Sequence, residues 1–93
     1  MDFEWDEAKA DANEQKHGVT FTEAMTVFAD PLSLTGYDPQ HAEDEDRFIT
    51  MGQSAQGRLL IISHTDRGEA IRIISAREAS RREKKDYEDG EFP

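Results

Sequence analysis

The stretch Ala70–Lys85, AIRIISAREASRREKK, decides how the chain is expected to fold. Its first half is an apolar run with three isoleucines, which is typical of a buried strand. One charged residue, Arg72, is set inside this run. A guanidinium in a buried strand loses its hydration and needs an anionic partner. We therefore expect this piece of chain to belong both to the core and to the functional site.

The second half of the same stretch predicts a helix. Ser75 and Glu78 have the S-x-x-E spacing of a capping box, so the helix is expected to begin at Ser75. Helical spacing would then place four cations on one face: Arg77, Arg81, Lys84 and Lys85. The apolar face lacks a large aliphatic side chain, so this helix is expected to be mobile or to be held by another chain.

Two helices are expected at the N-terminal end of the chain. Asp6 is a suitable N-cap for a helix that runs to about Lys16. A second helix is expected to start at Thr20, with Glu23 completing another capping box, and to end before Pro31. Both helices carry apolar residues on one face, so both are expected to pack against a sheet.

Strands are expected where the apolar pattern changes to a period of two, over residues 32–37, 47–52, 58–65 and 70–74. A loop at 66–69 would pair Arg72 with Ser63, or with His64 if the ladder contains a bulge. The acidic run at 43–46 is expected to lie in a solvated loop. These elements predict one α+β domain over residues 1–93, ordered α-α-β-β-β-β-α, with a mostly antiparallel four-stranded sheet.

Composition limits the function further. The net charge is −10, yet residues 67–85 hold seven Lys and Arg against three Asp and Glu. The total argues against a simple nucleic-acid binder, whereas the local cationic surface could still hold a phosphate backbone. The absence of cysteine excludes disulfides, thiol chemistry and cysteine-ligated zinc. No apolar run reaches membrane-spanning length, so a soluble cytoplasmic protein is expected.

Four segments carry a resemblance to a known family: FEWDEAKADANEQKHGVTF (3–21), EAMTVFADPLSL (23–34), RFITMGQSAQGRLL (47–60) and HTDRGEAIRIISAREASRRE (64–83). In this order they resemble the BrnT toxins of bacterial type II toxin–antitoxin systems. The resemblance implies a RelE-like fold and a metal-independent endoribonuclease that arrests translation. It also implies a ribbon-helix-helix antitoxin (BrnA-like), through which the complex would bind and repress its own operon. The chain departs from such toxins, which are often basic, in being strongly acidic.

The family pattern falls on these positions of the chain: Lys16, His17, Gly18, Arg47, Gly57, Arg58, Arg72 and Arg77. Among them, Arg72 and Arg77 are the first candidates for stabilising the phosphorane, because a planar guanidinium binds two phosphate oxygens and stays charged. The alternatives are a structural ion pair for Arg72 and a solvated position for Arg77. Guanidiniums held by the chain's own carboxylates, with no hollow beside them, would contradict the assignment.

Three histidines are candidates for proton transfer, since imidazole titrates near neutral pH. His17 is predicted to act in catalysis or to cap a helix end, and His64 to act as a base or as a hydrogen-bonded core residue. His41 lies in the acidic loop and is predicted to be passive. Their separations of 24 and 23 residues, without an H-x-x-x-H pair, argue against a zinc site, and neither a metal nor another cofactor is expected.

The remaining cations are expected to bind RNA phosphates or the antitoxin: Lys16, Arg47, Arg58, Arg81, Lys84 and Lys85. Two functions remain open. The first is a ribonuclease toxin that uses Arg72 and Arg77. The second is a binding module, namely an antitoxin-bound corepressor with little or no nuclease activity.

Overall fold

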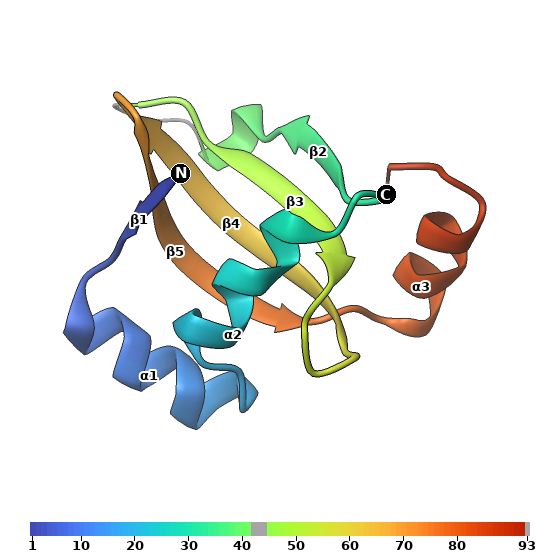
Figure 1. The fold of residues 1–93 in the computed structure, drawn as a ribbon, viewed down its shortest axis with the longest axis horizontal. Coiled ribbons are helices and arrows are strands. Elements are labelled where there is room, and N and C mark those ends of the chain that lie inside the picture. The colour runs from blue at the N-terminus through green and yellow to red at the C-terminus, as the bar shows by residue number, and fades with distance from the viewer. Residues whose placement is uncertain (42–44, 93) are drawn as a thin grey trace.

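The structure is a computed structural model that describes residues 1–41 and 45–92 (Figure 1). Its helices are α1 (Glu7–His17), α2 (Phe21–Thr26) and α3 (Arg81–Glu88), with short 3-10 helices η1 (Val27–Ala29) and η2 (Pro39–His41). Its strands are β1 (Asp2–Glu4), β2 (Leu34–Tyr37), β3 (Phe48–Gln53), β4 (Leu59–Arg67) and β5 (Ala70–Glu78). Residues 43 and 44 of the predicted acidic loop lie outside the described residues. The predicted α+β class is confirmed, and the predicted order of helices and strands holds from α1 onward, whereas β1 was not predicted.

The sheet has five strands in the order β1-β5-β4-β3-β2, so the predicted four-stranded sheet was wrong by one strand. β1 pairs with β5 in parallel, with Phe3 opposite Ile71, and the other neighbours are antiparallel. β1 has only three residues, which are too few for an alternating apolar pattern to be recognised in the sequence. β1 is a strand because β5 offers it an unpaired edge.

The predicted starts of the first two helices are confirmed. The Asp6 side chain accepts a hydrogen bond from Lys9 N at 3.0 Å, and the Thr20 side chain accepts one from Glu23 N at 3.0 Å. Gly18 ends α1 in the left-handed region with φ 68°, where glycine is favoured. The second capping box is only half formed, because the Glu23 carboxylate points to Arg58 rather than to the Thr20 backbone.

The two faces of the sheet differ in how they are covered. α1 and α2 lie on one face, as Figure 1 shows, and enclose the larger core cluster: Val19, Phe21, Ala24, Val27, Leu60, Ile62, Ile73 and Ala76. The opposite face has a smaller cluster of Met51, Ile61 and Ala79, with Leu34, Ile49, Leu59 and Tyr87 packed against it. We call this second face the open face, because α3 and the segment around η2 leave part of it uncovered by the described residues.

The boundary between β5 and α3 differs from the prediction. β5 continues to Glu78, and α3 begins after Ser80, which forms a complete capping box with Glu83. The sequence contains the S-x-x-E spacing twice, at 75–78 and at 80–83. The first copy stays extended because its residues are paired with β4, with Ser75 opposite Ser63. Arg77 therefore lies on a strand and is not part of a helical stripe of cations.

The hairpin between β4 and β5 is tighter than predicted. Arg67 pairs with Ala70, so only Gly68 and Glu69 form the turn, and Gly68 has φ 62°. Arg72 consequently lies opposite Thr65, and both predicted pairings of Arg72 were wrong. A bulge is present further along β5, since Ser63 pairs with Ser75 while His64 pairs with Ile73.

Tyr87 connects α3 to the rest of the fold. Its hydroxyl donates a hydrogen bond to Asp30 Oδ2 at 2.5 Å, and its ring packs against the smaller core cluster. Burial, together with the Asp30 carboxylate, raises the pKa of Tyr87 to about 12. Burial alone would raise the pKa of Asp30, but hydrogen bonds from Gln53 N, Tyr87 and Leu32 N hold that pKa below its ordinary value. α3 is thus held by the packing of one aromatic ring and by a few polar contacts. Among the described residues, no helix is long and apolar enough to cross a membrane.

Asn13 is expected to be the most important polar residue for joining α1 to β5. It is buried, its amide donates to Val19 O at 3.0 Å and to Ala76 O at 2.8 Å, and its oxygen accepts from Ala76 N at 3.0 Å. An Asn13→Ala variant would leave these backbone groups unpaired, so it should lower the free energy of unfolding by about 3 kcal/mol. Urea unfolding measures this change. The exposed Gln15→Ala is the matched control, and equal losses in the two variants would contradict the role of Asn13.

Candidate functional site

The open face contains a hollow of about 320 Å³ between the start of β3, the η2 segment and the middle of β4 and β5. Nine residues line this open-face hollow: Asp38, His41, Arg47, Ile49, Ile61, Ser63, Ile74, Ser75 and Arg77. They include two guanidiniums, an imidazole and two hydroxyls, against one carboxylate. Such a group of donors suits an anionic ligand with several oxygen atoms.

The bulge in β5 decides which arginines share the open face. Side chains five residues apart on a regular strand point to opposite faces. Because the bulge at Ile74 adds one residue, both Arg72 and Arg77 point to the open face, opposite Thr65 and Ile61. They are nevertheless far apart along the strand, at about 3.3 Å per residue. Only Arg77 lines the open-face hollow.

Arg77 is held by α3. Its guanidinium makes two hydrogen bonds to the Glu83 carboxylate, at 2.8 and 2.9 Å, and its side chain is 45% exposed. The bonds from Arg77, opposed by burial and aided by Ser80 N, lower the pKa of Glu83 to about 2. The guanidinium therefore lies beside the hollow while a carboxylate occupies its donor pair.

Arg72 makes an ion pair within the sheet. Its Nη1 lies 3.2 Å from Glu4 Oε2, on the neighbouring strand β1. This is the anionic partner that a guanidinium inside a strand requires, and it corresponds to the structural alternative for Arg72. Arg72 and Arg77 are thus both bound to carboxylates of the chain, and of these two arginines Arg77 is the one that lines the open-face hollow.

Arg47 is the second guanidinium of the open-face hollow. It lies just before β3, and its backbone oxygen accepts a hydrogen bond from Asp38 N at 2.8 Å. Its Nε atom is buried and has no hydrogen-bond partner among the described residues. A buried donor without a partner is uncommon in folded proteins and calls for an explanation, such as a bound water or ion.

The predicted catalytic histidines lie elsewhere. His64 is on the helix-covered face, 3% exposed, with Nε2 2.7 Å from Thr50 Oγ1 and the ring packed on Phe28 and Phe48. Burial lowers the pKa of His64, although the charge of Asp66 opposes this shift. His17 is exposed at the last position of α1, on that same side of the sheet. Neither lines the open-face hollow.

Arg58 is engaged by acidic side chains. Its guanidinium binds both Glu23 oxygens and donates to Glu78 Oε1 at 2.9 Å and to Gly18 O at 3.0 Å. The hydrogen bond from Arg58, opposed by burial and aided by Ser54, lowers the pKa of the buried Glu23. These contacts join β4 to α2 and β5, and the predicted RNA-binding role has no support in them.

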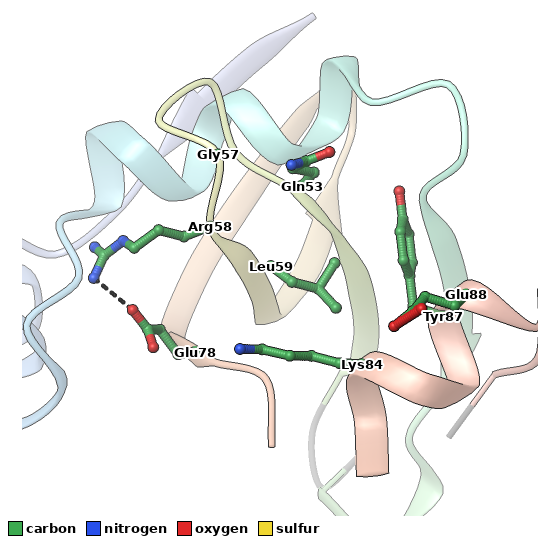
Figure 2. Close-up of a pocket in the computed structure, with 8 residues that line it drawn as sticks. All are labelled: Gln53, Gly57, Arg58, Leu59, Glu78, Lys84, Tyr87 and Glu88. Atoms are coloured by element: carbon green, nitrogen blue, oxygen red, sulfur yellow. Dashed lines mark hydrogen bonds and ion pairs between the residues drawn. The ribbon is translucent and has the colours of Figure 1, made fainter. Parts of the chain in front are cut away.

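Arg58 also lines a second cavity of about 370 Å³ beneath α3, shown in Figure 2 with Lys84 pointing toward Glu78. Its charges are balanced, since Arg58 and Lys84 face the carboxylates of Glu78 and Glu88. The open-face hollow has an excess of cations and is therefore the stronger candidate for an anionic substrate.

The other predicted RNA-binding cations are exposed on two helices: Lys16 near the end of α1, and Arg81, Lys84 and Lys85 on α3. In the part of the chain that the structure describes, no group of three or more His, Asp or Glu side chains gathers in a way that would hold a metal ion. The expectation of a metal-free reaction therefore stays a prediction.

The pair between Arg77 and Glu83 should make the stability depend on pH. Because the folded-state pKa of Glu83 is below its ordinary value near 4.5, its contribution is present above that value and is lost as the pH falls toward 2. We expect about 1 kcal/mol, since the exposure of Arg77 allows solvent screening. Glu83→Gln should keep the helix cap but lose this contribution. Urea unfolding at pH 6 and pH 2.5 should show a clear difference between wild type and variant at pH 6 and a much smaller one at pH 2.5, and an equal difference at both pH values would contradict the assignment.

Comparison with known proteins gives a match to a family model and matches to solved structures. A family model described as the ribonuclease toxin BrnT of type II toxin–antitoxin systems matches residues 5–83. The crystal structure of the Brucella abortus ribonuclease toxin BrnT aligns with a TM-score of 0.64 and 26% identity, covering 87% of this chain and 99% of that chain. A search of curated proteins gave no significant match. All nine residues of the open-face hollow fall within the range that the family model matches.

Proposed function

Because the chain belongs to the BrnT family of ribonuclease toxins of type II toxin–antitoxin systems, we propose that the open-face hollow is its RNA-cleaving site and that cleavage needs no metal ion. The observation that carries this proposal is the position of Arg47 and Arg77 in one hollow on the open face. RNA is the only nucleic acid whose own 2′-hydroxyl can attack the neighbouring phosphate, so a site made of cations and a proton acceptor is sufficient.

In the proposed reaction the 2′-oxygen forms a bond to phosphorus while its proton leaves to a base. The bond between phosphorus and the 5′-oxygen then breaks, and the leaving oxygen takes up a proton. Negative charge grows on the non-bridging oxygens in between, and the planar guanidinium of Arg77 can bind two of them. Arg47 supplies further donors at the opposite side of the hollow, and Ser63 and Ser75 supply hydroxyls from the sheet floor.

Glu83 would compete with the substrate in this site. Its two oxygens hold Arg77 with the same bidentate geometry that a phosphate would use. RNA must therefore displace Glu83 before Arg77 can bind the scissile phosphate. Because α3 is fixed mainly by Tyr87 and this ion pair, a small movement of α3 is enough.

The other predicted cations take different roles in this proposal. Arg72 and Arg58 stabilise the fold through Glu4 and Glu23. The exposed cations bind RNA phosphates away from the reacting bond or contact the antitoxin: Lys16, Arg81, Lys84 and Lys85. The family implies a protein antitoxin, and we propose that this antitoxin has a ribbon-helix-helix part. In this proposal the complex binds operator DNA only through the antitoxin. The toxin without its antitoxin arrests translation in the cytoplasm.

A second candidate function is a corepressor module without useful nuclease activity. The observation that favours it is the carboxylate of Glu83 on Arg77, together with a net charge of −10 that opposes RNA binding. The local excess of cations in the open-face hollow favours the nuclease.

Cleavage of a short RNA by the purified protein in EDTA separates these functions. Attack by the 2′-oxygen should give 2′,3′-cyclic phosphate and 5′-hydroxyl ends. Loss of activity in EDTA with restoration by Mg²⁺, or products with 5′-phosphate ends, would contradict the metal-free reaction. Absence of cleavage, with the antitoxin still bound, would favour the corepressor.

A further inference from the structure

Two polar side chains of the open-face hollow form a pair whose geometry suits proton transfer. His41 Nδ1 lies 2.8 Å from Asp38 Oδ2. The imidazole is 67% exposed, whereas the Asp38 side chain is only 15% exposed. The carboxylate is thus mostly shielded from solvent and the imidazole remains accessible to a substrate.

The pair is held in place by the local backbone. Pro39 opens η2, and its ring fixes the backbone turn that brings His41 back to Asp38. Asp38 N donates to Arg47 O at 2.8 Å, so the same residue that orients His41 also connects the segment to the start of β3. His41 and Arg47 therefore line the same hollow from two connected segments.

The hydrogen bond to Asp38 also determines which nitrogen carries the proton. An ionised carboxylate can only accept a hydrogen bond, so Nδ1 of His41 must donate. In the neutral imidazole Nε2 then has a free lone pair, as a general base requires.

We propose that His41 is the general base of RNA cleavage, taking the 2′-hydroxyl proton on Nε2, and that Asp38 is the positioning residue that orients it. This inference rests on the proposed function and names a residue of the same site. The proton moves from the 2′-oxygen to Nε2 as the new bond to phosphorus forms, and it can return from the imidazolium to the 5′-oxygen when that bond breaks. The reaction then needs no other reactant.

His41 suits this role better than the two histidines predicted from the sequence. His64 uses Nε2 for Thr50 on the helix-covered face, and His17 lies at the end of α1. His41 is the histidine that shares a hollow with both Arg47 and Arg77. The sequence signal was the spacing Asp38-Pro39-x-His41, in which a proline at the start of a turn brings two polar side chains together.

The test measures single-turnover cleavage of a short RNA by wild type, His41→Ala, Asp38→Asn and His17→Ala. His41→Ala should lose about 10²–10³-fold in rate, as expected for a general base. Free imidazole should restore part of this loss in His41→Ala and none of it in Arg77→Ala. Asp38→Asn should lower kcat with little change in KM, because the amide can hold the imidazole in the wrong tautomer. Circular dichroism checks the folding of each variant.

The outcomes distinguish this inference from the proposed function. A His41→Ala variant with the wild-type rate, while Arg77→Ala is inactive, would overturn the role of His41 and leave the site in place. A lower cleavage rate in His17→Ala, together with the wild-type rate in His41→Ala, would indicate that the general base is His17 on α1. A wild-type protein that cuts no RNA would overturn both proposals.

Discussion

Replacing Arg77 with alanine is expected to lower the rate of RNA cleavage by about 10²–10³-fold, the usual effect of removing one preorganised donor to a developing negative charge. Arg77 lines the open-face hollow and presents two donors in one plane, which matches the phosphorane oxygens. The substitution should affect the reaction more than substrate binding, so kcat should fall more than KM rises. Arg77→Lys should restore little, because an ammonium cannot bind two oxygens in the same plane.

Arg72 provides the matched comparison, because it lies on the same strand and points to the same face. Its guanidinium is paired with Glu4, away from the hollow, so Arg72→Ala should keep a rate within about threefold of wild type. Rates are measured with a fluorescent RNA at saturating protein. A large loss in Arg72→Ala and a small one in Arg77→Ala would place the reaction at the β1 end of the sheet instead.

The second large effect is expected on stability, in Arg58→Ala. Glu23 is 6% exposed, and its carboxylate depends on Arg58 for both of its oxygens. Without Arg58 a buried charge has only Ser54 as a partner, so the free energy of unfolding should fall by about 3 kcal/mol. We place the effect at the lower end of the usual range because Arg58 itself is one-third exposed.

Urea unfolding measures this loss, and Arg67→Ala is the matched control. Arg67 also makes an ion pair, with Glu45 at 3.2 Å, but both side chains are well exposed. That variant should lose less than about 0.5 kcal/mol. If both variants lost a similar free energy of unfolding, the burial of Glu23 would not strengthen the contribution of its ion pair, which would contradict this prediction. Near-normal RNA binding by Arg58→Ala, tested at low temperature, would separate its structural role from a role in the site.

The local features of the fold could be predicted from the sequence. Asp6 and Thr20 carry the N-cap chemistry of α1 and α2, and the structure places both helices where these residues indicated. Local hydrogen bonds are sufficient for such predictions, because the residues that make a cap are adjacent in the chain. Three predictions failed, for strand β1, for the end of β5 and for the residue opposite Arg72, and all three depend on how the strands pair. Ser75 has a capping-box spacing, but the ladder with β4 overrides it.

The site was predicted only in part for the same reason. The sequence indicated Arg72 and Arg77 from the type of side chain that phosphate chemistry needs, and it indicated Arg47 through the family resemblance. It could not indicate that a bulge at Ile74 turns Arg72 and Arg77 to one face, or that Arg77 and not Arg72 lines the open-face hollow. Asp38 and His41 were passed over because an acidic loop suggests solvated charges. Asp38 and His41 follow β2 in the chain. They lie beside the sheet residues of the hollow because β2 pairs with β3.

A crystal structure with an RNA that carries 2′-O-methyl groups, and therefore cannot be cut, tests the central claim most directly. We expect a phosphate within the open-face hollow, at hydrogen-bond distance from Arg77, with Glu83 displaced from the guanidinium. A phosphate bound at Arg72 or along the outer surface of α3, with Glu83 still on Arg77, would contradict the assignment of the site.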